Sequence, residues 1–180
     1  MKLAVVTSEF PPINAAAAAR IGPWVEELDS RGHQVSVFSS KGSSKIGSTQ
    51  HFESRRSVPS NKVGIFRRFY QEMRLAWNLS YMMKTSLKQI DGVVITSPPF
   101  FLATHIAKLV QRNGVPYIFD VRDRYPHVLF DLNVISKKTL IGRRLSFREK
   151  TCYGNSALIT SVTKGIDQEI DSFQKPHQHI

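Results

Sequence analysis

The chain has 180 residues, 41% of them hydrophobic and 22% charged, which fits a single globular domain and excludes a wholly disordered protein. Its 25 Lys and Arg residues outnumber its 14 Asp and Glu residues, and the formal net charge of +11 suits an anionic partner: nucleic acid, a membrane surface or a phosphorylated substrate. The single cysteine excludes an internal disulfide and a multi-cysteine zinc site, and no segment has the roughly 20 apolar residues of a spanning helix.

Short apolar runs alternate along the chain with stretches of helical spacing. In chain order, the sequence predicts strands at Lys2–Val6, Gln34–Phe38, Val63–Phe66, Gly92–Thr96, Pro116–Val121 and Ala157–Thr160. It predicts a helix through Ile21, Trp24, Val25 and Leu28 that ends at Arg31-Gly32, and further helices over about 67–90 and at Phe100–Arg112, Thr139–Tyr153 and Gly165–Phe173. The stretches Ser39–Asn61, which is polar, and Phe130–Ser136 are predicted to be loops. This alternation is typical of a Rossmann-like, doubly wound α/β fold, in which helices cover both faces of a mostly parallel sheet.

Four of the predicted strands are followed by unusual residues. These are Ser8-Glu9-Phe10-Pro11-Pro12, Ser97-Pro98-Pro99, the stretch from Asp120 to Pro126, and Ser161. Ligands of open α/β sheets bind beyond the carboxyl ends of the strands, near the point where the strand order reverses. We therefore expect these residues to line one edge of the sheet, with Ser97 also placed to cap the helix that follows it. The alternative is that the paired prolines merely end loops.

The helix that begins near Ala15 would direct free backbone amide groups at the same edge, which makes an anion site without a side chain. Arg20 adds a charge to that site, or it is an ordinary solvated arginine. The sequence has no Gly-x-Gly-x-x-Gly and no Walker motif, so a usual dinucleotide or ATP site lacks its sequence support.

The cluster Arg122-Asp123-Arg124 follows another predicted strand. A carboxylate between two guanidinium groups stays ionised, so Asp123 can orient an acceptor hydroxyl or position Arg122 toward a phosphate. The alternative is a structural ion pair that fixes the loop. His127 lies just beyond the cluster and is a candidate hydrogen-bond donor to a ligand.

Two stretches resemble landmarks of a known family. They read KLAVVTSEFPP followed by AARIGPWVEELDSRGHQVSVFSS, and GVVITSPPFFLATHIAKLVQRNGVPYIFDVRDRYP. Both are similar to family-four glycosyltransferases, which have the two-domain GT-B fold, and the nearest group is that of bacterial sugar transferases of surface-polysaccharide assembly, similar to the fucosamine transferase type. The resemblance covers the whole chain and reaches only the amino-terminal half of a complete enzyme.

The resemblance implies one half of a GT-B fold, with residues 1–180 as the acceptor-binding domain and the carboxyl-terminal donor-binding domain absent from this sequence. The complete enzyme would be a hexosyltransferase that moves a sugar from a nucleotide-sugar to a glycan or lipid-diphosphate-linked acceptor, with retention at the sugar carbon. The half alone would be inactive. The nucleotide-sugar is a substrate, and the resemblance implies no cofactor and no metal.

The family's motifs match this sequence at particular positions. Pro11, Pro12 and Asn14–Arg20 match the loop that approaches the donor diphosphate in relatives. That loop is normally glycine-rich, whereas alanines occupy positions 15–19 here, so either the loop has joined the helix or the diphosphate contact is weaker. The candidate catalytic residues are Arg122 and Asp123, and the candidate substrate-binding residues are Glu9, Pro12, Asn14, Ala15, Arg20, Ser97, Pro98, Arg124 and His127.

Basic and aromatic residues are interleaved in two predicted helices, between Arg67 and Lys88 and between Ile141 and Lys150. Basic amphipathic helices bind anionic membranes, so the sequence predicts a cytoplasmic protein that is peripheral on the inner face of the cell membrane. The alternative is core aromatics beside solvated charges. A different function, that of a non-catalytic basic domain binding nucleic acid or acting as a scaffold, stays open, although no nucleic-acid-binding signature occurs and nucleic acid is not the expected partner.

Overall fold

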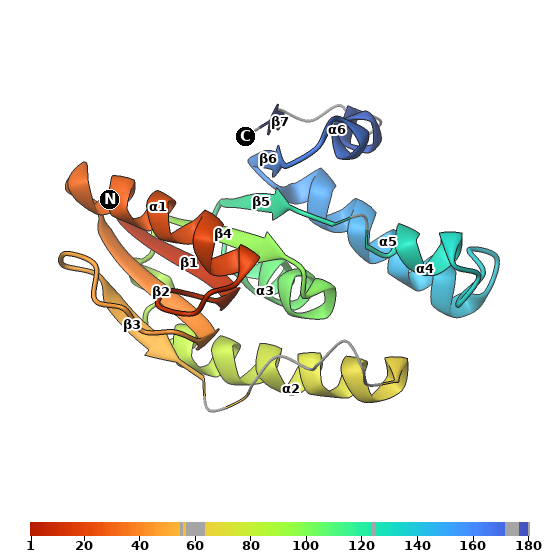
Figure 1. Cartoon of the computed structure of the whole chain (residues 1–180), viewed down its shortest axis with the longest axis horizontal. Helices are drawn as coiled ribbons and strands as arrows, with labels where there is room; N and C mark the ends of the chain where they lie inside the picture. The colour runs from red at the N-terminus through yellow and green to blue at the C-terminus, as the bar shows by residue number, and fades with distance from the viewer. Residues whose placement is uncertain (55, 57–63, 124, 172–176, 180) are drawn as a thin grey trace.

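The computed structural model describes residues 1–54, 56, 64–123, 125–171 and 177–179 (Figure 1). The strands are β1 (Lys2–Glu9), β2 (Gln34–Lys41), β3 (Gln50–Glu53), β4 (Gly92–Ser97), β5 (Tyr117–Val121), β6 (Leu158–Ser161) and β7 (His177–His179). The helices are α1 (Ala16–Ser30), α2 (Ile65–Lys84), α3 (Phe100–Arg112), α4 (His127–Asp131), α5 (Leu140–Asn155) and α6 (Lys164–Asp171), with a 3-10 turn η1 (Leu87–Gln89). The predicted alternation of strands and helices is confirmed.

The strands form one sheet in the order β3-β2-β1-β4-β5-β6-β7, and every neighbouring pair is parallel. This arrangement confirms the predicted Rossmann-like, doubly wound class. The strand order reverses between β1 and β4, because β2 and β3 lie to one side of β1 while β5, β6 and β7 follow on the other side of β4. In such sheets the crevice beyond the carboxyl ends of the two central strands is the usual ligand site.

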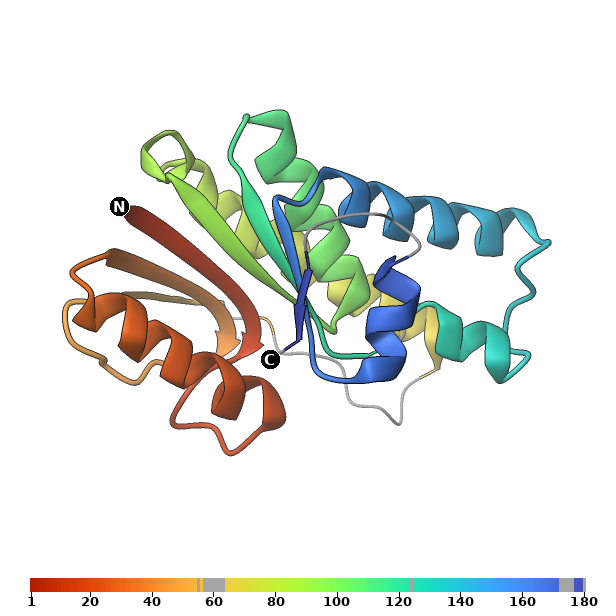
Figure 2. The ribbon, with the colours of Figure 1, turned by 90° about the horizontal axis from the view of Figure 1, so that it is seen from above.

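Helices cover both faces of the sheet. Figure 2 shows α1 on one side and α3 and α5 on the other. Alternate residues of β1 supply both cores: Val5 packs in the cluster that includes Ile21 and Val25 of α1, whereas Ala4 and Val6 pack in the larger cluster built from α2 and α3. Burial on both faces explains why β1 reads as a continuous apolar run rather than an alternating one.

A buried carboxylate on α2 fixes the start of α3. Glu72 is 2% exposed, and its Oε2 accepts a hydrogen bond from the Phe101 amide at 3.1 Å while its Oε1 accepts one from Arg68 Nε at 2.9 Å. The prediction that Ser97 caps this helix is wrong, because α3 begins three residues later, with Pro99 as the N-cap residue. A glutamate from a neighbouring helix therefore satisfies an amide group that the cap position leaves open.

Three other predicted elements differ from the structure. The strand predicted at Val63–Phe66 is wrong where the structure describes it, since α2 begins at Ile65; a four-residue apolar run is too short to distinguish a strand from the first turn of a helix. The predicted loop Ser39–Asn61 contains the edge strand β3, which was not predicted because its residues are mostly polar. The predicted loop Phe130–Ser136 begins inside α4. None of the described helices has the length and apolar character needed to cross a bilayer.

We expect Gly42→Ala to lower the free energy of unfolding by at least about 2 kcal/mol in urea titrations. Gly42 follows β2 with φ of 92°, and an added Cβ would overlap the carbonyl oxygen of Phe10 in the loop after β1. Gly32 is the matched control, because its φ is 78° but no heavy atom lies within 4 Å of an added Cβ. Gly32→Ala should lower the free energy of unfolding by only about 1 kcal/mol. Equal decreases at the two positions would show that the loop after β1 does not restrict the residue at position 42.

Candidate functional site

The carboxyl ends of the central strands meet at one edge of the sheet, which we call the rim. Val6 of β1 is in register with Ile95 of β4, and Ser97 at the end of β4 pairs with Val121, which in turn pairs with Ser161. In Figure 2 the strands drawn in red, green and teal converge toward this edge. The residues that follow β1, β4, β5 and β6 therefore lie along a common rim, as the sequence predicts.

The loop after β1 leads into the amino terminus of α1 at the rim. The Ile13 amide donates to the Phe10 carbonyl at 3.2 Å, and Ala15 is the extended N-cap residue, so the helix starts at Ala16. The alanine run has thus joined the helix, which was one of the two alternatives. Ala15 has no side chain that can cap the helix, and the first turn has no acidic residue. The positive end of α1 is left open to an anion.

Arg20, which is half-buried, forms an ion pair across the rim with the buried Asp120. Asp120 at the end of β5 has no exposed surface, and its Oδ1 lies 2.8 Å from Arg20 Nη2 and accepts a hydrogen bond from Thr160 Oγ1 at 2.7 Å. The Arg20 guanidinium also lies over the Trp24 ring, 5.3 Å from its centroid. Removing two charges from water is costly unless they are paired, so this contact holds α1 against β5.

Arg122 is anchored by the backbone of the loop after β4. Its amide donates to the Ser97 carbonyl at 2.9 Å, and its Nη2 donates to the Pro98 carbonyl at 3.1 Å, whereas its buried Nε has no partner among the described residues. Burial lowers the pKa of the Arg122 guanidinium, and the carboxylates of Asp120 and Asp123 act in the opposite direction. The guanidinium group keeps its charge at neutral pH, as a phosphate site requires.

The other predicted site residues differ in what surrounds them. Asp123 is exposed, and its carbonyl accepts from the Tyr125 amide at 2.8 Å. Glu9 ends β1 close enough to Arg122 for its carboxylate to raise the pKa of the guanidinium, against the effect of burial. Both Pro12 and Asn14 are exposed in the loop before α1. Arg124 lies outside the described residues.

His127 is turned toward a different partner. Its Nε2 lies 3.3 Å from Oε2 of Glu149, a buried carboxylate on α5, and its ring lies against Phe130. This contact joins α4 to α5. The predicted role of His127 in binding a ligand stays a prediction, as do the roles of the other site residues.

The structure brings together Glu9, Arg20, Pro98, Arg122 and the start of α1, although they come from three separate stretches of sequence. The sequence analysis missed Asp120 as the centre of this group. One signal for it was available: an acidic residue at the end of an otherwise apolar strand is rarely buried without a cationic partner. Thr160 carries no comparable signal, because threonine is common in strands.

Two further chemistries are not supported by the described part of the chain. The Cys152 thiol is buried on α5, and burial raises its pKa to about 12, so it is not a nucleophile at neutral pH. Within the described ranges no three His, Cys, Asp or Glu side chains are placed to share a metal ion. The chemistry available at the rim is that of guanidinium groups, a helix amino terminus and a carboxylate.

Comparison with known proteins assigns the chain to one family and identifies solved structures with a similar fold. The model of the family described as Glycosyltransferase Family 4 matches residues 18–180. No curated protein is similar enough in sequence to count as a relative of this chain.

Solved structures with a similar fold include two that were determined with bound small molecules. Phytolacca americana UGT2, complexed with UDP-2fluoro-glucose and pterostilbene, is similar with a TM-score of 0.62 at 11% identity, over 99% of this chain and 52% of that one. Glycyrrhiza uralensis UGT73P12, complexed with glycyrrhetinic acid 3-O-monoglucuronide, has a TM-score of 0.62 at 8% identity, over 99% and 48%. The chain spans about half the length of the proteins it matches. At these identities the likeness shows the GT-B type of fold alone.

We expect Arg20→Gln to destabilise the domain by about 3 kcal/mol in urea titrations, because it leaves the Asp120 carboxylate buried without its cation. Adding Asp120→Asn to this variant should restore part of the loss, since the uncompensated charge is then removed. Arg31→Gln at the C-cap of α1 is the matched control: Arg31 pairs with Glu27 at 2.7 Å, but both side chains are exposed, so the change in the free energy of unfolding should stay below about 1 kcal/mol. Equal effects of Arg20→Gln and Arg31→Gln would contradict the structural role of the buried pair.

Proposed function

Because the chain belongs to glycosyltransferase family 4, we propose that it is the acceptor-binding, amino-terminal half of a retaining glycosyltransferase. The whole enzyme moves a hexose-type sugar from a nucleotide-sugar to a glycan or lipid-linked acceptor in cell-surface polysaccharide synthesis. The observation that carries this proposal is the rim at the reversal of strand order, where the open end of α1 and the Arg122 guanidinium supply positive potential beside the exposed Asp123 carboxylate.

The rim can act on both partners of a sugar transfer. When a nucleotide-sugar reacts, negative charge builds up on the leaving diphosphate, and a helix amino terminus with a guanidinium donor stabilises that charge. Arg122 suits this role because the Pro98 carbonyl fixes its Nη2 and because the side chain is only partly buried. Asp123 accepts a hydrogen bond from the acceptor hydroxyl and so directs the hydroxyl oxygen at the sugar carbon.

The second wall of the active site comes from another domain in this proposal. The length comparison supports this, because the chain spans about half of two-domain neighbours of the same fold. The donor-binding domain holds most of the nucleotide-sugar, which is a substrate, and no cofactor takes part. The 180-residue chain is therefore expected to bind acceptor and to turn over nothing when assayed alone.

Location follows from the acceptor. A lipid-diphosphate-linked acceptor is presented at a membrane surface, and nucleotide-sugars are made in the cytoplasm, so we place the enzyme as a peripheral protein on the cytoplasmic face. The net charge of +11 favours contact with anionic lipid headgroups.

We expect Asp123→Ala to lower kcat of the two-domain enzyme by about 100-fold or more, as the loss of a residue that orients the attacking hydroxyl does. Asp123 is exposed, so the free energy of unfolding of this domain should stay within about 0.5 kcal/mol of the parent value. Glu26→Ala, which removes an exposed acid in the middle of α1, is the control and should leave kcat unchanged. Near-normal kcat for Asp123→Ala would remove Asp123 from the catalytic group.

A further inference from the structure

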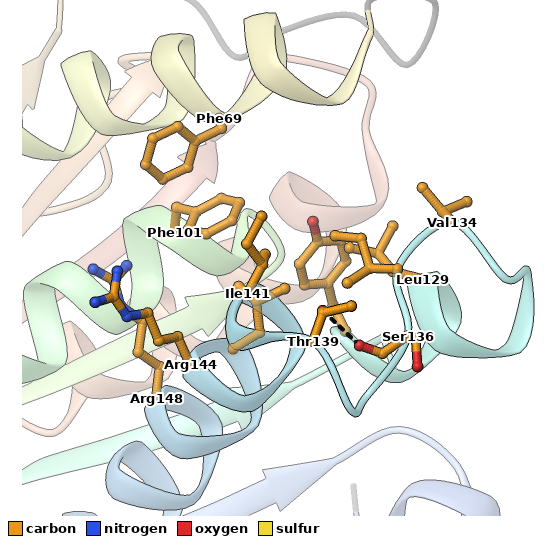
Figure 3. A pocket seen from close by; sticks show the side chains of 12 residues that line it. Phe69, Phe101, Leu129, Val134, Ser136, Thr139, Ile141, Arg144 and Arg148 are labelled. Carbon is orange, nitrogen blue, oxygen red and sulfur yellow. Dashed lines mark hydrogen bonds between the residues drawn. The ribbon is translucent and has the colours of Figure 1, made fainter.

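An apolar pocket of about 600 Å³ lies between the first turns of α2, α3 and α5 and the segment 125–139. Its aromatic wall is continuous: the rings of Phe69 and Phe101 meet edge to face at 4.7 Å between centroids, and Phe101 meets Tyr125 at 6.2 Å. Figure 3 shows Ile141 facing these rings, with Leu129 and Val134 on the far wall. Part of the lining is shared with the small core cluster around Phe100 and Phe130, namely Phe101, Tyr125, Leu129, Ile135 and Leu145.

Two arginines lie at one side of the pocket. Arg144 and Arg148 are four residues apart on α5, so they share one face of the helix with Ile141, and all three line the pocket (Figure 3). Among the described residues, neither has a carboxylate within ion-pair distance. The charge of Arg148 also helps burial to lower the pKa of His105 on α3. A positive field therefore extends over the mouth of an apolar cavity.

The surface around the mouth is apolar and cationic. Large hydrophobic side chains are exposed along residues 132–147, namely Leu132, Val134, Leu140, Ile141 and Phe147, and two of them, Val134 and Ile141, line the pocket. Between residues 131 and 150 there are six Lys and Arg residues against two acids, and one of those acids, Glu149, is buried beside His127. Exposed apolar groups among cations are the composition of a surface that meets anionic lipid.

The pocket adjoins the rim. Tyr125 follows Asp123 by two residues and donates its amide to the Asp123 carbonyl at 2.8 Å, and Phe101 follows the Pro98 loop that anchors Arg122. The rings of Phe100 and Tyr125, 5.0 Å apart, join the two loops. The pocket is therefore joined to the rim through Tyr125 and through the loop that precedes Phe100.

We propose that this pocket binds the hydrocarbon chain of a phosphate-bearing lipid, with the phosphate directed toward Arg144 and Arg148. The inference rests on the proposed function, since it assigns the acceptor to the lipid-linked class and gives its chain a site. The apolar walls match the chain, and the two arginines, which have no carboxylate partner among the residues described, match the phosphate. A polar glycan or a nucleic acid would leave those walls in contact with water.

The test is calorimetric binding of dodecyl phosphate to the 180-residue chain, kept below the concentration at which the amphiphile forms micelles. We expect it to bind at least 10-fold more tightly than dodecyl maltoside, which has the same chain without the charge, and inorganic phosphate should bind too weakly to measure. Shortening dodecyl to decyl phosphate should weaken binding by up to about 15-fold, the value for two buried methylene groups. Vesicles of phosphatidylcholine should retain the chain only when they also contain phosphatidylglycerol.

Variants locate the site. Ile141→Asp should weaken dodecyl phosphate binding at least 10-fold, whereas its neighbour Leu140, which is 77% exposed and does not line the pocket, should tolerate Leu140→Asp within twofold. Ile141 is 54% exposed, so its change should leave the fold intact by circular dichroism; Val134→Asp on the far wall gives the same test if it does not. Changing both Arg144 and Arg148 to Gln should weaken dodecyl phosphate and leave dodecyl maltoside unaffected.

Three outcomes would overturn the proposal: equal affinity for the two dodecyl compounds, displacement of dodecyl phosphate by millimolar inorganic phosphate, or unchanged binding in both pocket variants. The binding assay contains no nucleotide-sugar, so its result is independent of whether sugar transfer occurs. A two-domain enzyme that glycosylates a soluble glycan while this chain fails to bind dodecyl phosphate would keep the proposed function and remove the lipid site.

Discussion

The geometry of the rim depends on a carboxylate with no exposed surface. Asp120 lies at the end of β5, where Thr160 of β6 and Arg20 of α1 both donate to it, so three elements that are distant in sequence are held at one point. A buried charge cannot be left without its partner at low cost, which restricts where α1 can lie relative to the sheet. The open end of that helix is consequently held at the reversal of strand order, and Arg122 emerges two residues beyond Asp120 on the same edge.

The fold could be predicted from local pattern because each core element carries its own signal. The bounds Phe100–Arg112 were correct to the residue, since helical spacing begins after two prolines and Asn113-Gly114 ends it, with Gly114 at a φ of 71°. Local pattern failed where burial was weak, as in the polar edge strand β3, or where an apolar run was too short to show a period, as before α2.

The location of the site in the fold could be predicted from the sequence, whereas the contacts between its residues could be predicted only in part. Parallel strands end at one edge, so the sequence alone put the loops after β1, β4 and β5 together. The sequence could not distinguish the structural role of Arg20 from the proposed ligand-binding role of Arg122, because both are arginines near that edge. Arg20 is bound to an aspartate 100 residues away, whereas Arg122 is anchored to two backbone carbonyls and its buried Nε has no partner in the part of the chain that the structure describes. Such pairings are decided by tertiary packing, and no short-range pattern encodes them.

The loop after β5 connects two environments of opposite character. Arg122 and Asp123 face the polar rim, and Tyr125 forms a wall of the apolar pocket, so a few residues separate a site suited to phosphate from a site suited to hydrocarbon. A soluble sugar acceptor would use only the first of these. An amphiphile would use both at once, and binding energy from its unreactive chain would then help to hold its reactive end at the rim, where the geometry of the attack is set. The same loop would thereby couple recognition of the acceptor to its orientation.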